Sequence, residues 1–160
     1  MDKRDRQFHT YRGYQKIKQE RTRLTPSMED YLEMIYRHCK NEGYVRIFKL
    51  SELLNVQAPS VTRTVQRLAD LGLVDYEKYG LVKLTQEGEK IGQVLLERHI
   101  LIESFLSKIG VRDTLLRDTE MIEHNISVEA LHSIECFNSY LEDNPHILKE
   151  FEEYKKSRGY

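Results

Sequence analysis

The sequence predicts a mainly α-helical protein in which an N-terminal winged helix-turn-helix precedes an all-helical region. Three observations favour this fold class. A short apolar helical pattern, a tight turn and a longer amphipathic pattern follow one another between residues 48 and 72. Two short β-prone runs then surround a Tyr-Gly turn, and the remaining residues, 85–160, keep a helical apolar period. Helix, turn, helix and hairpin in this order are typical of a winged helix-turn-helix.

The first helix is predicted to begin at Pro26 and to end near Lys40. Thr25 is suited to cap its N-terminus, and proline fits the first helical turn because it has no N–H to lose. An apolar residue recurs at helical spacing and forms one face: Met28, Tyr31, Leu32 and Ile35. Gly43 is suited to the left-handed backbone that ends helices.

The helix-turn-helix is predicted from residues 48–54, the turn 55–57 and a helix that opens at Ala58 and stops at Gly72. In the shorter helix the residues expected to point inward are Leu50, Leu53 and Leu54. Those of the longer helix are Val61, Val65, Leu68 and Leu71.

The opposite face of the longer helix has small polar residues at its start and cations further along, which suits a helix lying in the major groove of DNA. Residues 73–84 then form a hairpin that reads as a wing. The residues predicted to contact DNA on the helix, in the turn before it and at the wing are Gln57, Pro59, Ser60, Thr62, Arg63, Gln66, Arg67, Lys78 and Tyr79.

Four further helices are predicted over residues 85–108, 112–124, 128–142 and 146–156. Their mostly apolar seams suit a helical dimerisation unit. This divides the chain into a basic arm (1–24), a DNA-binding domain (25–84), a linker helix (85–110) and a dimerisation domain (111–160). The arm carries eight Lys or Arg against three Asp or Glu, whereas residues 99–160 carry seven against twelve. The arm is therefore the part suited to a polyanion.

Composition favours a cytoplasmic location. No apolar run approaches the roughly 20 residues that cross a bilayer, and the N-terminus has no apolar stretch of signal-peptide type. The two cysteines, Cys39 and Cys136, are far apart in sequence, and neither belongs to a C-x-x-C pair. Free thiols are therefore expected, rather than a disulfide or a thiolate metal site.

Three sets of side chains that can bind metal are spread along the chain. Asp30 and Glu33 are three residues apart and share the helix face opposite the apolar stripe. His99 falls on the apolar seam of the linker helix. Glu120, Glu123 and His124 share a face of the next helix and suit a divalent ion. Each set taken alone is more typical of a solvated surface or a core histidine.

The residues quoted so far resemble the diphtheria-toxin-repressor family of metal-dependent transcriptional regulators, in its short, manganese-responsive branch. The resemblance spans residues 25–143 and keeps the order of its motifs, which are Thr25 to Glu33, Pro59 to Thr62, Tyr76 to Leu81, Leu84-Thr85 with Gly88, Arg98-His99 and Glu120 to His124. The iron-responsive branch usually has Met and Cys where this chain has Asp30 and Glu120.

The resemblance implies a homodimeric repressor that binds double-stranded operator DNA when it holds metal and that controls manganese uptake. It implies six metal ligands, namely Asp30, Glu33, His99, Glu120, Glu123 and His124. Because these are oxygen and nitrogen ligands, Mn²⁺ suits them, and Fe²⁺, Co²⁺ and Cd²⁺ have compatible chemistry. Two divalent ions balance four carboxylates, so a binuclear site is expected. Metal is expected to lock the dimer in the arrangement that fits an operator.

Three alternatives are kept. One is an iron-responsive repressor of the same family. Another is a winged-helix regulator that does not depend on metal, with an incidental acidic cluster. The third, a dimetal enzyme, is disfavoured because its helical bundles use Glu-x-x-His, whereas His124 follows Glu123 directly. No nucleophile stands out beyond the ligands, so we do not expect an enzyme.

Overall fold

The computed structural model describes residues 24–159, which belong to two compact units. The first unit ends at Glu97, and the second runs from Arg98 to the C-terminus. Helix α5 (Gln86–Lys108) contributes its first half to one unit and its second half to the other. The predicted basic arm lies outside the described residues, apart from Leu24. The division of the chain into four parts stays a prediction.

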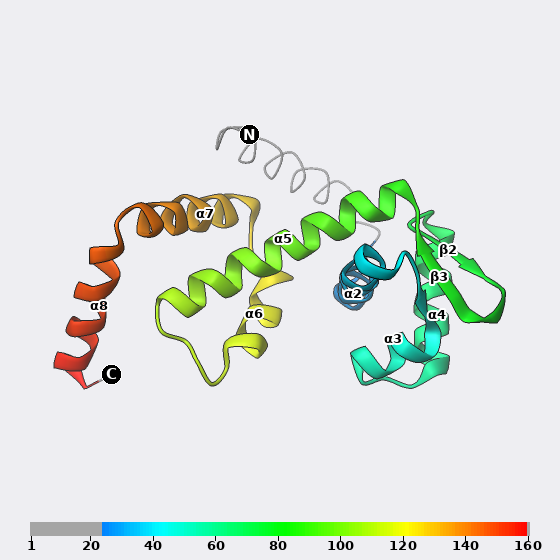
Figure 1. Cartoon of the computed structure of the whole chain (residues 1–160), viewed down its shortest axis with the longest axis horizontal. Helices are drawn as coiled ribbons and strands as arrows, with labels where there is room; N and C mark the ends of the chain where they lie inside the picture. The colour runs from blue at the N-terminus through cyan, green and yellow to red at the C-terminus, as the bar shows by residue number, and fades with distance from the viewer. Residues whose placement is uncertain (1–23, 160) are drawn as a thin grey trace. The chain divides into compact units, whose positions relative to one another are not determined.

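The first unit is a winged helix-turn-helix, as predicted (Figure 1). Its sheet has the strand order β1-β3-β2, with both pairs antiparallel. Val82 of β3 lies between Val45 of β1 and Tyr76 of β2. Before α5, the elements of this unit are α2 (Pro26–Glu42), β1 (Val45–Arg46), α3 (Ile47–Leu54), α4 (Ala58–Asp70), β2 (Val74–Glu77), the 3₁₀ turn η1 (Lys78–Gly80) and β3 (Leu81–Leu84).

Helix α2 begins and ends where its capping residues predict. The backbone N–H of Met28 donates a hydrogen bond to Thr25 Oγ1 (3.3 Å), and Pro26 opens the helix. Gly43 has φ +77° and its N–H donates to the carbonyl of Cys39. The helix runs two residues beyond the predicted end at Lys40 because this glycine, with no Cβ to clash, closes the last turn.

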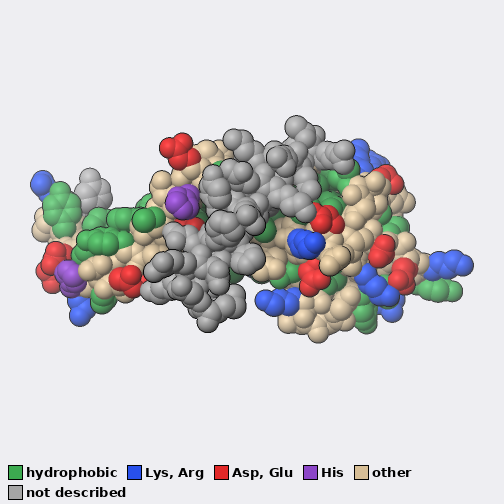
Figure 2. All heavy atoms as spheres, turned by 90° about the horizontal axis from the view of Figure 1, so that it is seen from above, with side chains coloured by type: hydrophobic (Ala, Val, Ile, Leu, Met, Phe, Trp, Pro, Cys, Tyr) green, Lys and Arg blue, Asp and Glu red, His purple; other side chains and the backbone are tan. Residues whose placement is uncertain are grey.

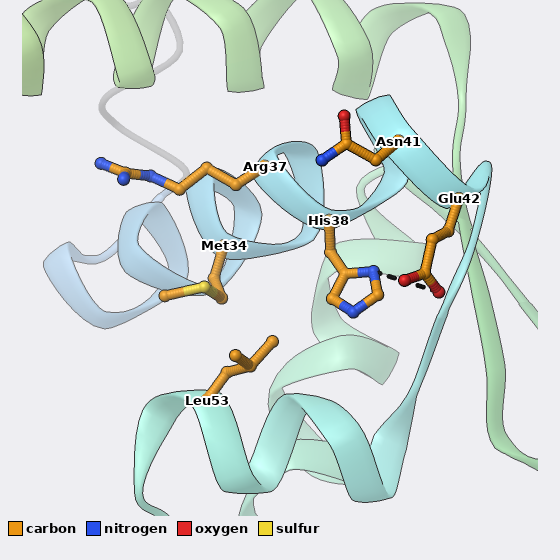
Figure 3. Close-up of a pocket in the computed structure, with 6 residues that line it drawn as sticks. All are labelled: Met34, Arg37, His38, Asn41, Glu42 and Leu53. Atoms are coloured by element: carbon orange, nitrogen blue, oxygen red, sulfur yellow. Dashed lines mark ion pairs between the residues drawn. The ribbon is translucent and has the colours of Figure 1, made fainter.

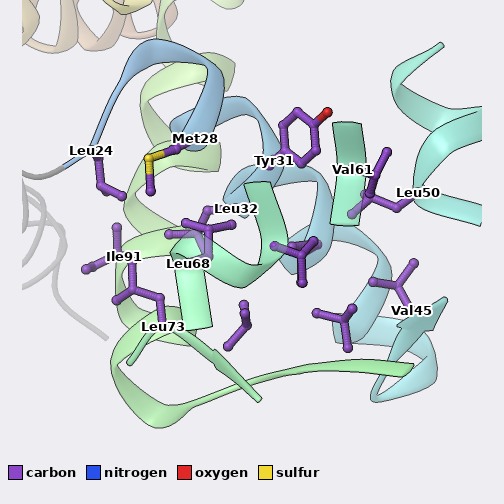
Figure 4. Packing of buried hydrophobic residues seen from close by; sticks show 14 of the residues in the cluster. Leu24, Met28, Tyr31, Leu32, Val45, Leu50, Val61, Leu68, Leu73 and Ile91 are labelled. Atoms are coloured by element: carbon purple, nitrogen blue, oxygen red, sulfur yellow. The ribbon is translucent and has the colours of Figure 1, made fainter. Parts of the chain in front are cut away.

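The core of the first unit is formed by the apolar faces of α2, α3 and α4 against the sheet and the start of α5 (Figure 4). Leu32, Leu50 and Leu68 are fully buried at its centre. Leu53, predicted to point inward, is 39% exposed. That prediction was wrong because neighbouring positions on so short a helix cannot all face one core.

A glycine lets α5 approach α2 closely. A Cβ added at Gly92 would lie 2.6 Å from the Cβ of Tyr36, closer than real side chains approach. The absence of a side chain at Gly92 therefore sets how α5 packs on the DNA-binding unit. This places the beginning of α5 by contact with backbone-proximal atoms rather than by flexible side chains.

The second unit contains the end of α5, α6 (Leu115–Glu123), α7 (Val128–Asp143) and α8 (Pro145–Arg158). Its buried apolar residues are Ile102, Leu106, Leu131 and Leu141. The buried Asn138 ties α7 to α5, because its Nδ2 donates to the carbonyl of Leu101 (3.1 Å). Within residues 24–159, no helix combines the length and the apolar character that a membrane span needs.

One predicted helix boundary in this unit was wrong. The pattern placed the start of α6 at Arg112, but the helix begins at Leu115 after a turn. Thr114 has φ −111°, outside the helical region, and its hydroxyl donates to Asp118 Oδ2 (2.6 Å). A threonine that bonds a side chain one turn ahead marks a helix start, and this local signal outweighs the apolar period.

Candidate metal centre and nucleic-acid interface

Two of the six predicted metal ligands lie on α2. Glu33 is 7% exposed, and its Oε1 accepts hydrogen bonds from Arg37 Nε (2.9 Å) and Nη2 (2.6 Å). Asp30, three residues earlier on the same face, is half-buried. A merely solvated acidic face would leave both carboxylates exposed. Burial of an ionised group is costly without partners, so this face is built around charge.

The second unit holds a buried imidazole–carboxylate pair. His99 Nδ1 lies 3.0 Å from Glu123 Oε2, and the two residues are 7% and 2% exposed. Because a buried carboxylate needs a donor, we assign the Nδ1 proton to His99 in this arrangement. The seam position of His99 was predicted. Its partner on α6 could not be found from spacing, because 24 residues separate the two.

Two further predicted ligands surround this pair. His124 Nε2 lies 3.8 Å from Glu123 Oε1, and the side chain of His124 is 12% exposed. The coordinating atoms of His99 and Glu123, and those of Glu123 and His124, lie within 4.8 Å of each other. Glu120 is exposed, and it is not among such groups within the described residues.

The side chains of this cluster fit a divalent cation of hard or borderline character. Glu123 offers oxygen, and His99 and His124 offer nitrogen. Burial raises the pKa of the Cys39 thiol to about 11, so that this thiol stays protonated at neutral pH. Cys136 is exposed on α7. Without thiolates, the cluster favours Mn²⁺ over softer ions such as Cu⁺.

Two buried charged residues were missed by the sequence reasoning. Glu29 of α2 is 3% exposed and Arg98 of α5 is 2% exposed, and both have interaction partners. Each stands directly before a predicted ligand, Asp30 and His99. A charged residue next to a candidate ligand was the available signal, but periodicity alone gives no reason for its burial.

Helix α4 presents the predicted DNA-contacting face to solvent. Ser60, Arg63, Gln66 and Arg67 are exposed, whereas Thr62 is half-buried at the edge of that face. Gln57 and Pro59 are exposed at the start of the helix. Exposed cations beside short polar groups suit phosphate and base-edge contacts.

The wing ends in an exposed tyrosine. Tyr79 is 92% exposed and has φ +65°, and Gly80 follows with φ +72°. Two successive positive φ values close the predicted Tyr-Gly turn. Lys83 Nζ donates to Glu77 Oε1 (2.9 Å) across the hairpin, which raises the pKa of Lys83. Lys and Arg side chains project at this end of the DNA-binding unit (Figure 2).

An open hollow of about 210 Å³ lies between α2 and α3 and was not predicted (Figure 3). Its wall includes Met34, His38 and Leu53, with Glu42 beside the histidine. His38 Nδ1 lies 3.8 Å from Glu42 Oε2, one helical turn away. An i,i+4 pair of this kind is ordinary on a helix surface and adds little stability.

Comparison with protein families identifies the chain. The model "Iron dependent repressor, N-terminal DNA binding domain" matches residues 23–82, and "Iron dependent repressor, metal binding and dimerisation domain" matches residues 85–152. The chain belongs to the iron-dependent repressor family. It is accordingly a metal-dependent, DNA-binding transcriptional repressor, and the family's members are regulators of transcription.

Similar curated proteins cover nearly their whole length. The HTH-type transcriptional regulator MntR of Lysinibacillus sphaericus is 43% identical over 132 residues, which are 82% of this chain and 95% of that protein. MntR of Listeria innocua is 42% identical over 130 residues, 81% of this chain and 92% of that protein.

Solved structures agree with the fold. The manganese regulator SloR is 29% identical with a TM-score of 0.64 and covers 73% of this chain and 55% of its own. The IdeR protein of T. acidophilum is 28% identical with a TM-score of 0.61 and covers 68% of this chain and 53% of its own. The chain spans about half the length of these solved relatives.

Proposed function

We propose that this repressor responds to manganese, acts as a cytoplasmic homodimer on double-stranded operator DNA and controls manganese uptake. The observation that carries the proposal is the buried His99–Glu123 pair with His124 beside it. Its oxygen and nitrogen donors suit Mn²⁺. Similarity to MntR proteins and to a manganese regulator supports the same metal. No enzymatic activity is part of the proposal.

The proposed metal site uses the six ligands that the family resemblance implies. Asp30 and Glu33 come from the DNA-binding unit, and His99, Glu120, Glu123 and His124 come from the second unit. Four carboxylates close together repel one another, at about 4 kcal/mol for two charges 4 Å apart with an effective dielectric of 20. Two divalent ions neutralise that charge, so the proposed site is binuclear.

Metal acts by shifting a conformational equilibrium. Ligands from both units tie the DNA-binding unit to the unit that the family model describes as metal binding and dimerisation. Metal therefore favours the spacing between the two recognition helices of a dimer that fits two half-sites. Raising a competent state from 1% to 50% needs only about 2.7 kcal/mol, which ligand binding readily supplies.

The proposed reading head is α4 with the wing. The polar and cationic side chains of α4 enter the major groove, and Lys78 and Tyr79 at the wing contact the flanking backbone. The residues proposed to contact DNA are Gln57, Pro59, Ser60, Thr62, Arg63, Gln66, Arg67, Lys78 and Tyr79. The proposed domain boundaries are those expected from the sequence.

The test is a gel-shift titration of the purified dimer with Mn²⁺ and, separately, Fe²⁺ under anaerobic conditions. The proposal expects Mn²⁺ to induce operator binding at lower free concentration than Fe²⁺. The reverse order favours the iron-responsive alternative. His99→Ala separates the third possibility, since a metal-independent winged-helix regulator binds DNA equally well with that substitution.

A further inference from the structure

The hydroxyl of Thr62 is committed to its own helix. Thr62 Oγ1 donates a hydrogen bond to the carbonyl oxygen of Ala58, at 3.0 Å and one turn earlier in α4. Threonine has one hydroxyl proton, so the bond uses its only side-chain donor. A phosphate or a base acceptor can receive that proton only if the intrahelical bond breaks. Thr62 is therefore unlike Ser60, which is exposed and for which the structure shows no such commitment.

The same bond fixes what Thr62 presents outward. The side chain is branched at Cβ and held in a staggered rotamer, so turning the hydroxyl back to the i−4 carbonyl leaves the γ-methyl in the other open position. Thr62 lies on the side of α4 that also carries Gln66, four residues later, at the edge of the exposed face. It also lies in the N-terminal half of the helix, which enters deepest into a major groove.

We propose that Thr62 is a specificity-determining residue that recognises thymine by contact between its γ-methyl and the C5-methyl of the base. This rests on the proposed function, in which α4 lies in the major groove of operator DNA. Thymine alone among the bases presents a methyl group there. The neighbouring Gln66 carries the amide that pairs with adenine edges, so the two residues together suit an A·T-rich step.

The other side of α4 divides the work differently. Arg63 and Arg67 are exposed, four residues apart, and turned away from Thr62 around the helix. They supply charge for phosphates or guanine edges, whereas the Thr62 side supplies apolar and amide contacts. A contact between two methyl groups buries about one methylene equivalent each, which corresponds to about a fourfold change in affinity for each half-site.

Two substitutions separate the methyl from the hydroxyl. Thr62→Val keeps a methyl at this position and removes the hydroxyl, whereas Thr62→Ser keeps the hydroxyl and removes the methyl. The proposal expects Thr62→Val to bind operator within about twofold of wild type and Thr62→Ser to lose about fourfold per half-site. Thr64→Ser is the matched control, since it removes a methyl from the same helix on a different side, and it is expected to change nothing.

The decisive experiment uses duplexes selected from a random double-stranded library by the full-length, Mn²⁺-loaded dimer. Each thymine of a selected duplex is replaced in turn by deoxyuridine, which lacks only the C5-methyl. Wild type is expected to lose about fourfold at one thymine in each half-site, and Thr62→Ser is expected to be insensitive to that same replacement.

Three results overturn the proposal. One is insensitivity of wild type to every deoxyuridine. Another is an equal loss in wild type and in Thr62→Ser, and the third is loss of binding in Thr62→Val with full binding in Thr62→Ser, which would assign the contact to the hydroxyl. If the wild type enriches no duplex in the presence of Mn²⁺, the proposed function itself has failed, and the two failures are thereby distinguished.

Discussion

Replacing Glu123 by glutamine removes one negative charge from the candidate metal centre and little else. Glu123 is 2% exposed, and its Oε2 lies 3.0 Å from His99 Nδ1. Glutamine has nearly the same volume, and its amide oxygen can accept the same hydrogen bond. A hydrogen bond to a charged group contributes about 1.5–3 kcal/mol and a neutral one about 0.5–1.5, so the variant loses about 1–2 kcal/mol and stays folded.

The effect on metal is larger. A unit charge 4 Å from another contributes about 4 kcal/mol at an effective dielectric of 20. A divalent ion at ligand distance interacts at least as strongly, so the account predicts at least about a thousandfold weaker Mn²⁺ binding in Glu123→Gln. Operator binding at a Mn²⁺ concentration that saturates the wild type is then lost.

Isothermal titration with Mn²⁺ and urea unfolding of the metal-free protein measure the two effects separately. Glu142→Gln is the matched control, because Glu142 is 66% exposed on α7 and pairs with Lys108 at the surface (2.8 Å). An exposed pair contributes about 0–1 kcal/mol, so this variant keeps wild-type metal binding. Wild-type Mn²⁺ affinity in a folded Glu123→Gln protein would refute the reasoning.

The remaining predictions concern stoichiometry, packing and thiol chemistry. Glu120→Gln lowers Mn²⁺ stoichiometry from two to one per protomer in a titration if the exposed Glu120 serves the second ion, and an unchanged value of two removes it from the ligand set. Gly92→Ala places a Cβ 2.6 Å from Tyr36 and destabilises the fold by about 1–3 kcal/mol in urea unfolding, less any gain in helix propensity; equal or greater stability contradicts the packing. At pH 8, Cys39, with a pKa of about 11, is alkylated far more slowly than the exposed Cys136, as peptide mass mapping can show, and equal rates would count against burial. Since burial raises this pKa above its unfolded value, the stability that it contributes is complete below about pH 9 and is lost as the pH rises through about 11.

Capping and periodicity made most of the fold predictable. Thr25, Pro26 and Gly43 defined α2 because their effects are local, and the Tyr-Gly turn of the wing followed from the same kind of signal. Strand β1 was seen only as a β-prone stretch. Its pairing with β3 joins residues more than 30 positions apart, and two residues carry too little pattern to specify a partner.

The candidate site was predictable as types of residue but not as contacts. Spacing showed that Glu120, Glu123 and His124 share a helix face, and the family resemblance implied all six ligands. Neither indicated that Glu123 would be buried against His99 while Glu120 stayed exposed. The difference depends on how α6 packs on α5, which is decided by contacts distant in sequence. The burial of Glu29 and Arg98 was missed for the same reason.

Operator binding measured against free Mn²⁺ tests the central claim most directly. The purified dimer is titrated with Mn²⁺ in the presence of a labelled duplex selected by the protein, with a chelator-treated sample as the reference. The account predicts weak binding in chelator and tight binding once the metal ligands are filled. Equally tight operator binding in chelator and in saturating Mn²⁺ would contradict it.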